Sequence, residues 1–310
     1  MNKNPLVTVG LPTFNRKNLL ERALNSVLNQ TYKNIDILVS DNHSDDGTEE
    51  IMLEYAKKDS RIRYFRQEKN QGVGYQGKFL LENSLGEYYC GLCDDDYLSE
   101  NYVKDCVNIL IENPEISVTY GTVNLIDENN NIIKKCPTFK TLSEDFNERI
   151  KDYVSTGIDA FFASAFIKTD LCKIITSDYE KNRFCEDQLF VLKSLIYGKS
   201  VCSEKAIFYK LNNGCTKDLE TLKHTFNLES MTTENFWYYL SKEYMNSILN
   251  DGIYVDKFSF DERLDFAITA YEAVKTKFKI DYLPKKKSLG QKFIDKIRGK
   301  NNGKLSKKNI

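Results

Sequence analysis

Between residues 6 and 126, short apolar runs alternate with longer segments whose apolar positions recur at helical spacing, as at Leu20, Leu24 and Val27. We expect strands at Leu6–Leu11, Ile35–Val39, Ile62–Phe65, Glu87–Leu92 and Ile116–Ile126, and helices at Arg16–Gln30, Thr48–Lys57, Gly77–Asn83 and Ser99–Glu112. Strands that alternate with helices form parallel sheets through right-handed crossovers. The pattern therefore predicts an α/β fold with an open, mostly parallel, Rossmann-like sheet and helices on both faces.

The alternation weakens after residue 126, where Asp127–Asn131 is typical of a loop. We expect an apolar stretch at Ala160–Ile167, a helix at Asp187–Tyr197, a strand at Val201–Leu211, and helices at Phe226–Leu249 and Phe258–Phe278. The α/β part is therefore predicted to be followed by a mainly helical C-terminal region.

Composition limits the class of protein. With 310 residues, 41% of them hydrophobic and 29% charged, the chain is near the average for globular proteins, which excludes wholesale disorder and a single small module. No apolar run reaches the roughly 18 residues that a membrane-spanning helix needs. The 8 cysteines are scattered among apolar residues, and no signal peptide precedes Leu6, so we expect reduced, mostly buried thiols in a cytoplasmic protein.

Although the net charge is −1, the C-terminal end of the chain is strongly basic. A helix over the tail would place four apolar residues on one face among many lysines and arginines: Leu289, Phe293, Ile294 and Ile297. That pattern is typical of an interfacial helix that binds anionic lipid, and a helix that packs on the body with a frayed basic end explains it equally well. Nucleic-acid binding is disfavoured, because the excess basic residues are confined to the tail and no recognised module accompanies them.

Three adjacent carboxylates, Asp94, Asp95 and Asp96, directly follow the expected strand Glu87–Leu92. Neighbouring carboxylates repel one another, so a bound cation with oxygen ligands explains them well. Mg²⁺ or Mn²⁺ there would bridge to a diphosphate. The alternative is a solvated acidic turn that caps the helix expected from Ser99.

Asp41 follows the second expected strand, where its carboxylate can accept hydrogen bonds from a base or a ribose. Asp45 and Asp46 suit a turn followed by a helix start, which explains them without a binding role. In open α/β sheets, ligands bind at the carboxyl ends of the strands. We therefore expect Pro12, Ser40–Asp41 and Cys93–Asp94 to converge on one crevice.

Five motifs occur in order along the chain: Val9–Arg16 (VGLPTFNR), Val39–Thr48 (VSDNHSDDGT), Asn70–Gly72 (NQG), Cys93–Asp96 (CDDD) and Glu186–Phe190 (EDQLF). Together they resemble the motifs of family-2 inverting glycosyltransferases of GT-A fold, over about residues 5–210. The resemblance implies a GT-A domain over residues 1–215, with a nucleotide-binding part to about 125 and an acceptor part beyond it. A helical region over 216–284 and a basic tail over 285–310 would follow.

The resemblance also implies residue roles. Pro12, Thr13 and Phe14 would line the base pocket, Asp41 would receive the base, Asp94 and Asp95 would reach the ribose and diphosphate, and Asp96 would ligate Mn²⁺ or Mg²⁺. Many relatives have an Ala-Arg-Asn stretch after Asn-x-Gly, whereas this chain reads VGYQGKF over Val73–Phe79. Lys78 is the candidate for the phosphate-binding role of that arginine, as a point charge.

Asp187 matches the aspartate that serves as catalytic base in the family. The chemistry requires such a group, because an acceptor hydroxyl must lose its proton as it attacks the anomeric carbon opposite the leaving diphosphate. Without the resemblance, Glu186 and Asp187 also suit a charge pair at a helix N-terminus.

The expected function is transfer of a hexose or N-acetylhexosamine from a nucleotide diphosphate-sugar, with uridine as the family default, to a hydroxyl of a glycan or lipid-linked acceptor. The setting would be cell-surface glycan synthesis, in the cytoplasm or at the inner face of the cell membrane. A nicotinamide-dependent oxidoreductase is disfavoured, since the first turn lacks G-x-G-x-x-G. A catalytically inactive sugar-nucleotide-binding module stays open, although the presence of Asp96 and Asp187 argues against it.

Cys90 and Cys93 have the spacing of a redox or zinc pair. The pattern puts both inside the strand that precedes the acidic turn, and no second pair completes a zinc site. We therefore expect structural roles for both.

Overall fold

The computed structural model describes residues 4–138, 140–156, 165–177, 186–212 and 236–277. Two compact units divide the chain, residues 1–231 and 232–310, and each is considered by itself. The expected boundary near residue 215 lies between 213 and 235, outside the described residues.

The N-terminal unit is built on one mixed sheet with the strand order β3-β2-β1-β4-β8-β6-β9-β5, and β7 pairs with β6. The strands are β1 (Val7–Thr13), β2 (Ile35–Asp41), β3 (Ile62–Arg66), β4 (Tyr88–Gly91), β5 (Tyr97–Leu98), β6 (Ile116–Ile126), β7 (Ile132–Lys135), β8 (Phe166–Lys168) and β9 (Lys199–Leu211). The pairings give β1–β4, β6 and β9 one direction and give β5, β7 and β8 the other. The expected open, mostly parallel sheet is confirmed.

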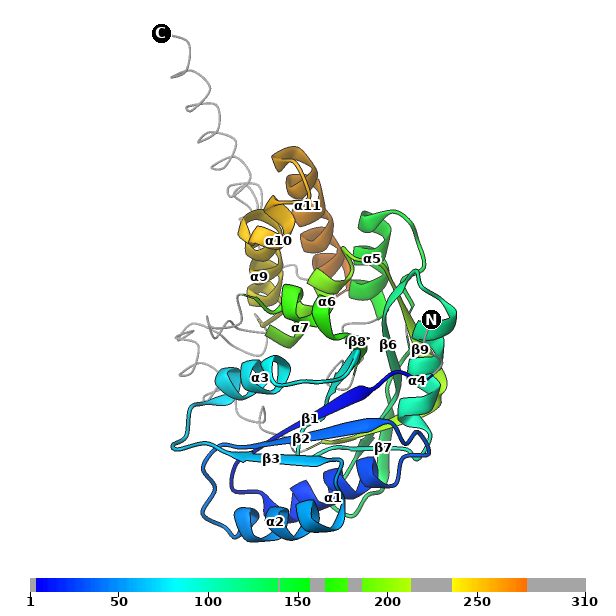
Figure 1. Cartoon of the computed structure of the whole chain (residues 1–310). Coiled ribbons are helices and arrows are strands. Elements are labelled where there is room, and N and C mark those ends of the chain that lie inside the picture. The colour runs from blue at the N-terminus through cyan, green and yellow to red at the C-terminus, as the bar shows by residue number, and fades with distance from the viewer. Residues whose placement is uncertain (1–3, 139, 157–164, 178–185, 213–235, 278–310) are drawn as a thin grey trace. The chain divides into compact units, whose positions relative to one another are not determined.

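Helices cover both faces of the sheet, as expected (Figure 1). α1 (Lys17–Leu28) and α2 (Thr48–Lys58) lie on one face of β1–β3, and α3 (Val73–Glu82) lies on the other. Leu20, Leu24 and Val27 of α1 are completely buried in the main core, which also contains α4 (Tyr102–Glu112). The helical spacing of these apolar residues therefore marked the face that packs on the sheet.

Both β1 and β2 extend two residues further than the sequence pattern predicted, with Thr13 opposite Asp41 in register. β1 ends at Thr13 although it contains Pro12, which cannot donate a backbone hydrogen bond. β1 pairs with β4 only as far as Gly10, so Pro12 has one neighbouring strand, and a proline is tolerated at such an edge position. Asp41 is thus the last residue of its strand and not the first residue beyond it.

The segment after β4 also differs from expectation. β4 ends at Gly91, one residue before the predicted end at Leu92, so Cys93 lies in the turn and does not share the strand with Cys90, contrary to the interpretation of the cysteine spacing. Tyr97 and Leu98 pair with Phe208 and Tyr209 of β9, which delays the start of α4 to Tyr102. The acidic turn is therefore held between two strands.

The remaining described helices of this unit are α5 (Phe146–Thr156), α6 (Thr169–Ile175) and α7 (Glu186–Ser194). The second unit contains α9 (Phe236–Asn250), α10 (Gly252–Val255) and α11 (Phe260–Lys277), so the described part of the C-terminal region is helical, as expected. Within the described residues, none of the helices has the length and apolarity to span a membrane. The amphipathic tail at 285–310 lies outside the described residues.

Candidate active site

The turn that links β4 to β5 carries all three adjacent carboxylates. The backbone N–H of Asp96 donates to the carbonyl oxygen of Cys93 at 3.2 Å and so closes the turn. Asp94, Asp95 and Asp96 are all buried, with exposed fractions of 6%, 5% and 1%. Buried carboxylates require partners, so a solvated acidic turn does not describe this segment.

Thr13, the last residue of β1, and Arg16, which precedes α1, supply partners for the turn. The hydroxyl of Thr13 donates to Oδ2 of Asp94 at 2.8 Å. Nη1 of Arg16 donates to Oδ1 of Asp94 at 3.2 Å and to Oδ2 of Asp95 at 3.1 Å. Burial raises the pKa of Asp94, and the Thr13 hydrogen bond and the Arg16 charge counteract part of that shift. The ends of β1 and β4 therefore converge, as the sequence predicted.

Asp96 has only one of its two oxygens engaged. Oδ1 accepts a hydrogen bond from the backbone N–H of Leu211 at 2.9 Å. Oδ2 is buried and has no hydrogen-bond partner among the residues that the structure describes. Burial raises the pKa of Asp96 to about 7, against the positive charge of Lys210, which lowers it. An unsatisfied buried carboxylate oxygen is the kind of atom that a divalent cation would satisfy.

An arginine and two stacked tyrosines also contact the turn and the strand that follows it. Arg22 of α1 donates to the carbonyl oxygen of Asp95, and its guanidinium carbon lies 5.1 Å from the centroid of the Tyr97 ring. Tyr97 in turn stacks on Tyr209 of β9 with 4.5 Å between ring centroids. These contacts fix the turn between α1 and β9.

Asp41 lies at the carboxyl end of β2 and is completely buried. Its carboxylate accepts hydrogen bonds from the backbone N–H of Ser44 at 2.9 Å, from the Ser44 hydroxyl at 2.6 Å and from the Tyr64 hydroxyl at 2.7 Å. Burial and the Asp41 hydrogen bond raise the pKa of Tyr64. The carboxylate is thus occupied by protein donors, and its role in receiving a base stays a prediction.

The Asn-Gln-Gly motif packs beside the end of β2. Nδ2 of Asn42 donates to Oδ1 of Asn70 at 2.9 Å, and the backbone N–H of Gln71 donates to Oδ1 of Asn42 at 2.7 Å. Gly72 has φ +84°, a left-handed conformation that glycine adopts without strain, and α3 begins immediately after it. The motif therefore sets the position of α3 over the sheet.

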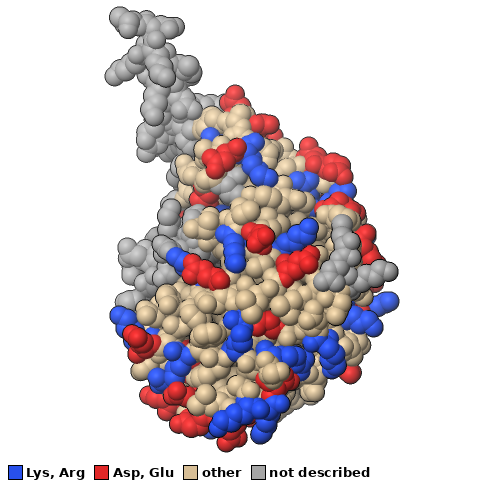
Figure 2. Space-filling view, in the orientation of Figure 1, with Lys and Arg blue, Asp and Glu red and all other residues tan. Residues whose placement is uncertain are grey.

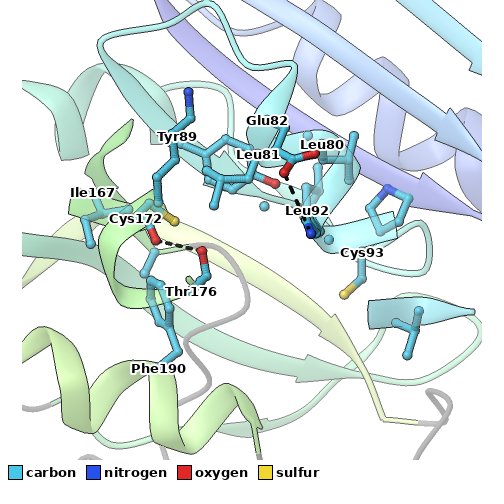
Figure 3. A pocket seen from close by; sticks show the side chains of 18 of the residues that line it. Leu80, Leu81, Glu82, Tyr89, Leu92, Cys93, Ile167, Cys172, Thr176 and Phe190 are labelled. Atoms are coloured by element: carbon cyan, nitrogen blue, oxygen red, sulfur yellow. Dashed lines mark hydrogen bonds and ion pairs between the residues drawn. The ribbon is translucent and has the colours of Figure 1, made fainter. Parts of the chain in front are cut away.

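A cavity of about 630 Å³ lies between the sheet, α3, α6 and α7. Figure 3 shows apolar side chains around it, including Leu81, Ile167 and Phe190. Pro12 and Cys93 also line it, so the cavity adjoins the acidic turn.

The structure brings some predicted site residues together and leaves others apart or undescribed. Lys78 lines the cavity, and its Nζ lies 4.0 Å from Oε1 of Glu82. Phe14 is 41% exposed beyond the end of β1. Asp187 is the second residue of α7, as expected for a helix start, but its side chain lies outside the described residues.

Sequence reasoning assigned no role to Arg16 or Lys210. Arg16 forms ion pairs with Asp94 and Asp95, and the charge of Lys210 lowers the pKa of Asp96. Arg16 ends the first motif, three residues after Thr13, and that position was the signal available for it. Lys210 adjoins Asp96 through the pairing of β5 with β9, which the sequence did not indicate. Figure 2 shows lysines and arginines interspersed with acidic residues on the visible described surface. The distribution of charge therefore does not mark Arg16 or Lys210 as site residues.

Comparison with known proteins gives consistent matches. The family model described as glycosyl transferase family 2 matches residues 8–174, more than half of the chain. An uncharacterised glycosyltransferase of Methanocaldococcus jannaschii is 30% identical over 213 residues, 67% of this chain and 72% of that protein. The GalNAc(5)-diNAcBac-PP-undecaprenol beta-1,3-glucosyltransferase of Campylobacter jejuni is 31% identical over 184 residues, 59% of this chain and 56% of that protein. The chain spans about a fifth of the length of Rickettsia glycosyltransferases that it also matches.

Solved structures show the same fold. S. aureus TarS 1-349 superposes with a TM-score of 0.61 at 18% identity, covering 93% of this chain and 77% of that chain. A mannosyltransferase from Pyrobaculum calidifontis, solved with GDP-Man and Mn²⁺, gives a TM-score of 0.52 at 13% identity, covering 91% and 78%. With the family model and the similar relatives, the fold confirms the resemblance carried by the five motifs. The chain belongs to glycosyl transferase family 2.

Proposed function

We propose that this protein is a metal-dependent, inverting glycosyltransferase that moves a hexosyl or N-acetylhexosaminyl group from a UDP-sugar to an acceptor hydroxyl. The proposal rests on the acidic turn, which the Thr13–Asp94 hydrogen bond joins to the end of β1. In this turn, Oδ2 of Asp96 is buried and has no hydrogen-bond partner among the described residues. A uridine donor is supported by the TarS structures, which were solved with UDP and with UDP-GlcNAc.

The donor set fits a divalent cation. Asp96 would hold Mn²⁺ or Mg²⁺ through its unsatisfied Oδ2, with Asp95 next to it. When bound, the cation supplies positive charge that stabilises the departing nucleotide diphosphate. Thr13 and Arg16 hold Asp94 in place beside it, where it would contact the ribose or diphosphate.

The transfer step assigns the remaining roles. The acceptor oxygen forms a bond to the anomeric carbon while the bond from that carbon to the diphosphate oxygen breaks, and Asp187 takes the hydroxyl proton. A single displacement from the opposite face inverts the anomeric configuration. Pro12, Thr13 and Phe14 would line the base pocket, Asp41 would receive the base, and Lys78 would contact phosphate.

The acceptor is proposed to be a glycan or a lipid-linked glycan used in cell-surface polysaccharide synthesis. The name of the Campylobacter relative describes transfer onto an undecaprenol-linked glycan. The apolar cavity beside the turn also suits an acceptor with an apolar part. The basic tail would hold the enzyme peripherally at the inner face of the cell membrane.

Donor screening tests the proposal. Purified protein with Mn²⁺ is incubated with a panel of UDP- and GDP-sugars, and nucleotide release is measured. We expect slow hydrolysis of one UDP-hexose or UDP-N-acetylhexosamine even without acceptor. Nucleotide binding without release, with or without extracts that contain acceptors, would instead identify a catalytically inactive sugar-nucleotide-binding module.

A further inference from the structure

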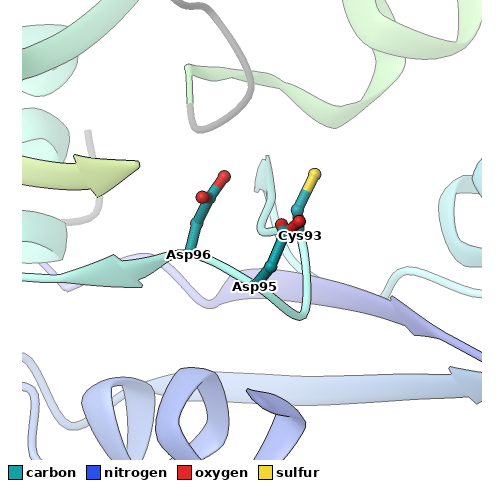
Figure 4. A group of neighbouring side chains, drawn as sticks. All are labelled: Cys93, Asp95 and Asp96. Atoms are coloured by element: carbon teal, nitrogen blue, oxygen red, sulfur yellow. The ribbon is translucent and has the colours of Figure 1, made fainter. Parts of the chain in front are cut away.

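Cys93 lies beside the two innermost carboxylates of the acidic turn. Its Sγ, one carboxylate oxygen of Asp95 and one of Asp96 all lie within 4.8 Å of one another. Figure 4 shows the three side chains projecting from the same short segment after β4. Cys90, in contrast, stays inside β4 and is completely buried. The sequence spacing of the two cysteines therefore does not make them a pair, and Cys93 belongs to the turn.

A second observation indicates that this group accepts a ligand. Oδ2 of Asp96 is buried and lacks a hydrogen-bond partner within the described residues, while Asp96 as a whole is 1% exposed. Leaving such an oxygen unsatisfied costs free energy, which a coordinated cation would recover. The thiol adds a donor of a different kind from those that Mg²⁺ prefers.

The spacing is close to that of a single coordinated ion. Zinc bonds are about 2.3 Å to sulfur and about 2.0–2.2 Å to carboxylate oxygen, so two of its ligand atoms in tetrahedral geometry lie about 3.3–3.7 Å apart. The three ligand atoms already lie within 4.8 Å of one another, so they would approach by at most about 1.5 Å to reach that range. A coordinated thiol gives up its proton, so the group would present a thiolate and two carboxylates to the ion.

We propose that Cys93 is a ligand of the divalent cation together with Asp95 and Asp96, and that this centre binds thiophilic divalent cations such as Zn²⁺ and Co²⁺ more tightly than Mg²⁺. Thiolate ligands favour Zn²⁺, whereas Mg²⁺ requires oxygen donors. The inference rests on the cation site of the proposed function and adds the identity of a ligand. It makes Zn²⁺ a competitor of Mg²⁺ and Mn²⁺ at the same turn.

Cobalt(II) provides a direct test because thiolate coordination produces a charge-transfer absorption band in the near ultraviolet. The full chain is titrated with Co²⁺, with and without UDP, and Co²⁺ binding is measured in parallel by equilibrium dialysis. We expect the band in the parent protein, its loss in Cys93→Ser, and its retention in Cys202→Ser, which removes a half-buried thiol from β9. Zn²⁺ affinity of Cys93→Ser should fall at least about tenfold, and Mg²⁺ affinity should change less than about threefold.

A measurement on the parent protein covers the case in which Cys93→Ser does not fold. Zn²⁺ should protect Cys93 from alkylation, as located by mass spectrometry, and Mg²⁺ at the same concentration should not. Bound Co²⁺ without the band, a band that persists in folded Cys93→Ser, alkylation of Cys93 unaffected by Zn²⁺, or no Co²⁺ binding at all would overturn the proposal. None of these readouts depends on sugar transfer, so an inactive protein that shows the band would refute the proposed function and leave the Cys93 ligand standing.

Discussion

Thr13 donates its hydroxyl hydrogen to Oδ2 of Asp94 across 2.8 Å, although 81 positions separate the two residues in the sequence. Arg16 adds a second link between the same elements, through its contacts with Asp94 and Asp95. Hydrogen bonds and ion pairs thus link the carboxyl end of β1 and the start of α1 to the acidic turn after β4. Any ligand that binds the turn must therefore interact with a site already occupied by a guanidinium.

Replacing Arg16 with glutamine should lower the free energy of unfolding of the metal-free protein and raise its affinity for a divalent cation. Loss of the guanidinium leaves Asp94 and Asp95 less compensated, at a cost of about 0.5–1 kcal/mol after allowance for its partial exposure. The same loss removes positive charge that competes with a cation, so Mn²⁺ affinity without nucleotide should rise about threefold to tenfold. Thermal unfolding with and without Mn²⁺ measures both effects.

Arg61→Gln is the matched control. Arg61 pairs with Asp59 at 2.7 Å between α2 and β3, away from the acidic turn. It should lose a similar amount of stability without any gain in the response to Mn²⁺. If both variants respond to Mn²⁺ like the parent, Arg16 does not compete with the cation.

Gly121→Ala should destabilise the N-terminal unit. A Cβ at this position would lie 2.3 Å from a ring carbon of Tyr102 and 2.6 Å from the carbonyl oxygen of Ala206, and both neighbours are in the core. We expect a loss of about 1–3 kcal/mol in the free energy of unfolding, measured by denaturant titration.

Gly77→Ala is the control variant. Its Cβ would meet no atom within 4 Å and lies inside α3, so the substitution should raise the free energy of unfolding by up to about 1 kcal/mol. Equal effects would show that the contacts of Gly121 are not tight.

Local periodicity was sufficient to predict six of the nine strands, most helices and the convergence of Pro12, Asp41 and Asp94 on one edge. It failed where pairing between distant segments decides the outcome. β5 is too short to stand out in the sequence and exists because Tyr97 and Leu98 pair with β9. That pairing delays α4 and brings Lys210 to Asp96.

The strand ends show the same limit at the level of single residues. The turn chemistry of Pro12 indicated an early end to β1, yet Pro12 is tolerated because β4 no longer pairs there. Interpreting Cys90 and Cys93 as two residues of one strand gave Cys93 a structural role, whereas the structure places Cys93 in the turn beside Asp95 and Asp96. Contacts made across the sheet, and not propensity, determine both positions.

Asp187→Asn should lose most of its turnover and keep its nucleotide affinity. The amide preserves the shape of the carboxylate but cannot take the proton of the acceptor hydroxyl, so kcat should fall on the order of 10²–10⁴-fold. Steady-state kinetics with the donor found by screening and calorimetry with UDP separate the two quantities. Turnover within a few-fold of the parent would move the base role elsewhere, with Glu186 as the next candidate.

Deleting Ser288–Ile310 should release the protein from anionic vesicles and leave donor hydrolysis intact. Basic residues near an anionic surface contribute about 1 kcal/mol each, and four apolar side chains of the tail would add to the binding. Sedimentation with vesicles at low and high salt compares the two proteins, and parent binding should fade as salt rises. Equal pelleting of both would identify the tail as a packing element or a disordered end.

The most direct test of the account is calorimetric titration of UDP into the parent protein and Asp96→Ala, each with Mn²⁺ and with a chelator. If Asp96 holds the cation that binds the diphosphate, the parent should bind UDP about 10–100-fold more tightly with Mn²⁺, and folded Asp96→Ala should bind it equally weakly in both conditions. A parent affinity that Mn²⁺ does not change, or an undiminished Mn²⁺ effect in Asp96→Ala, would contradict a metal-dependent nucleotide site at this turn.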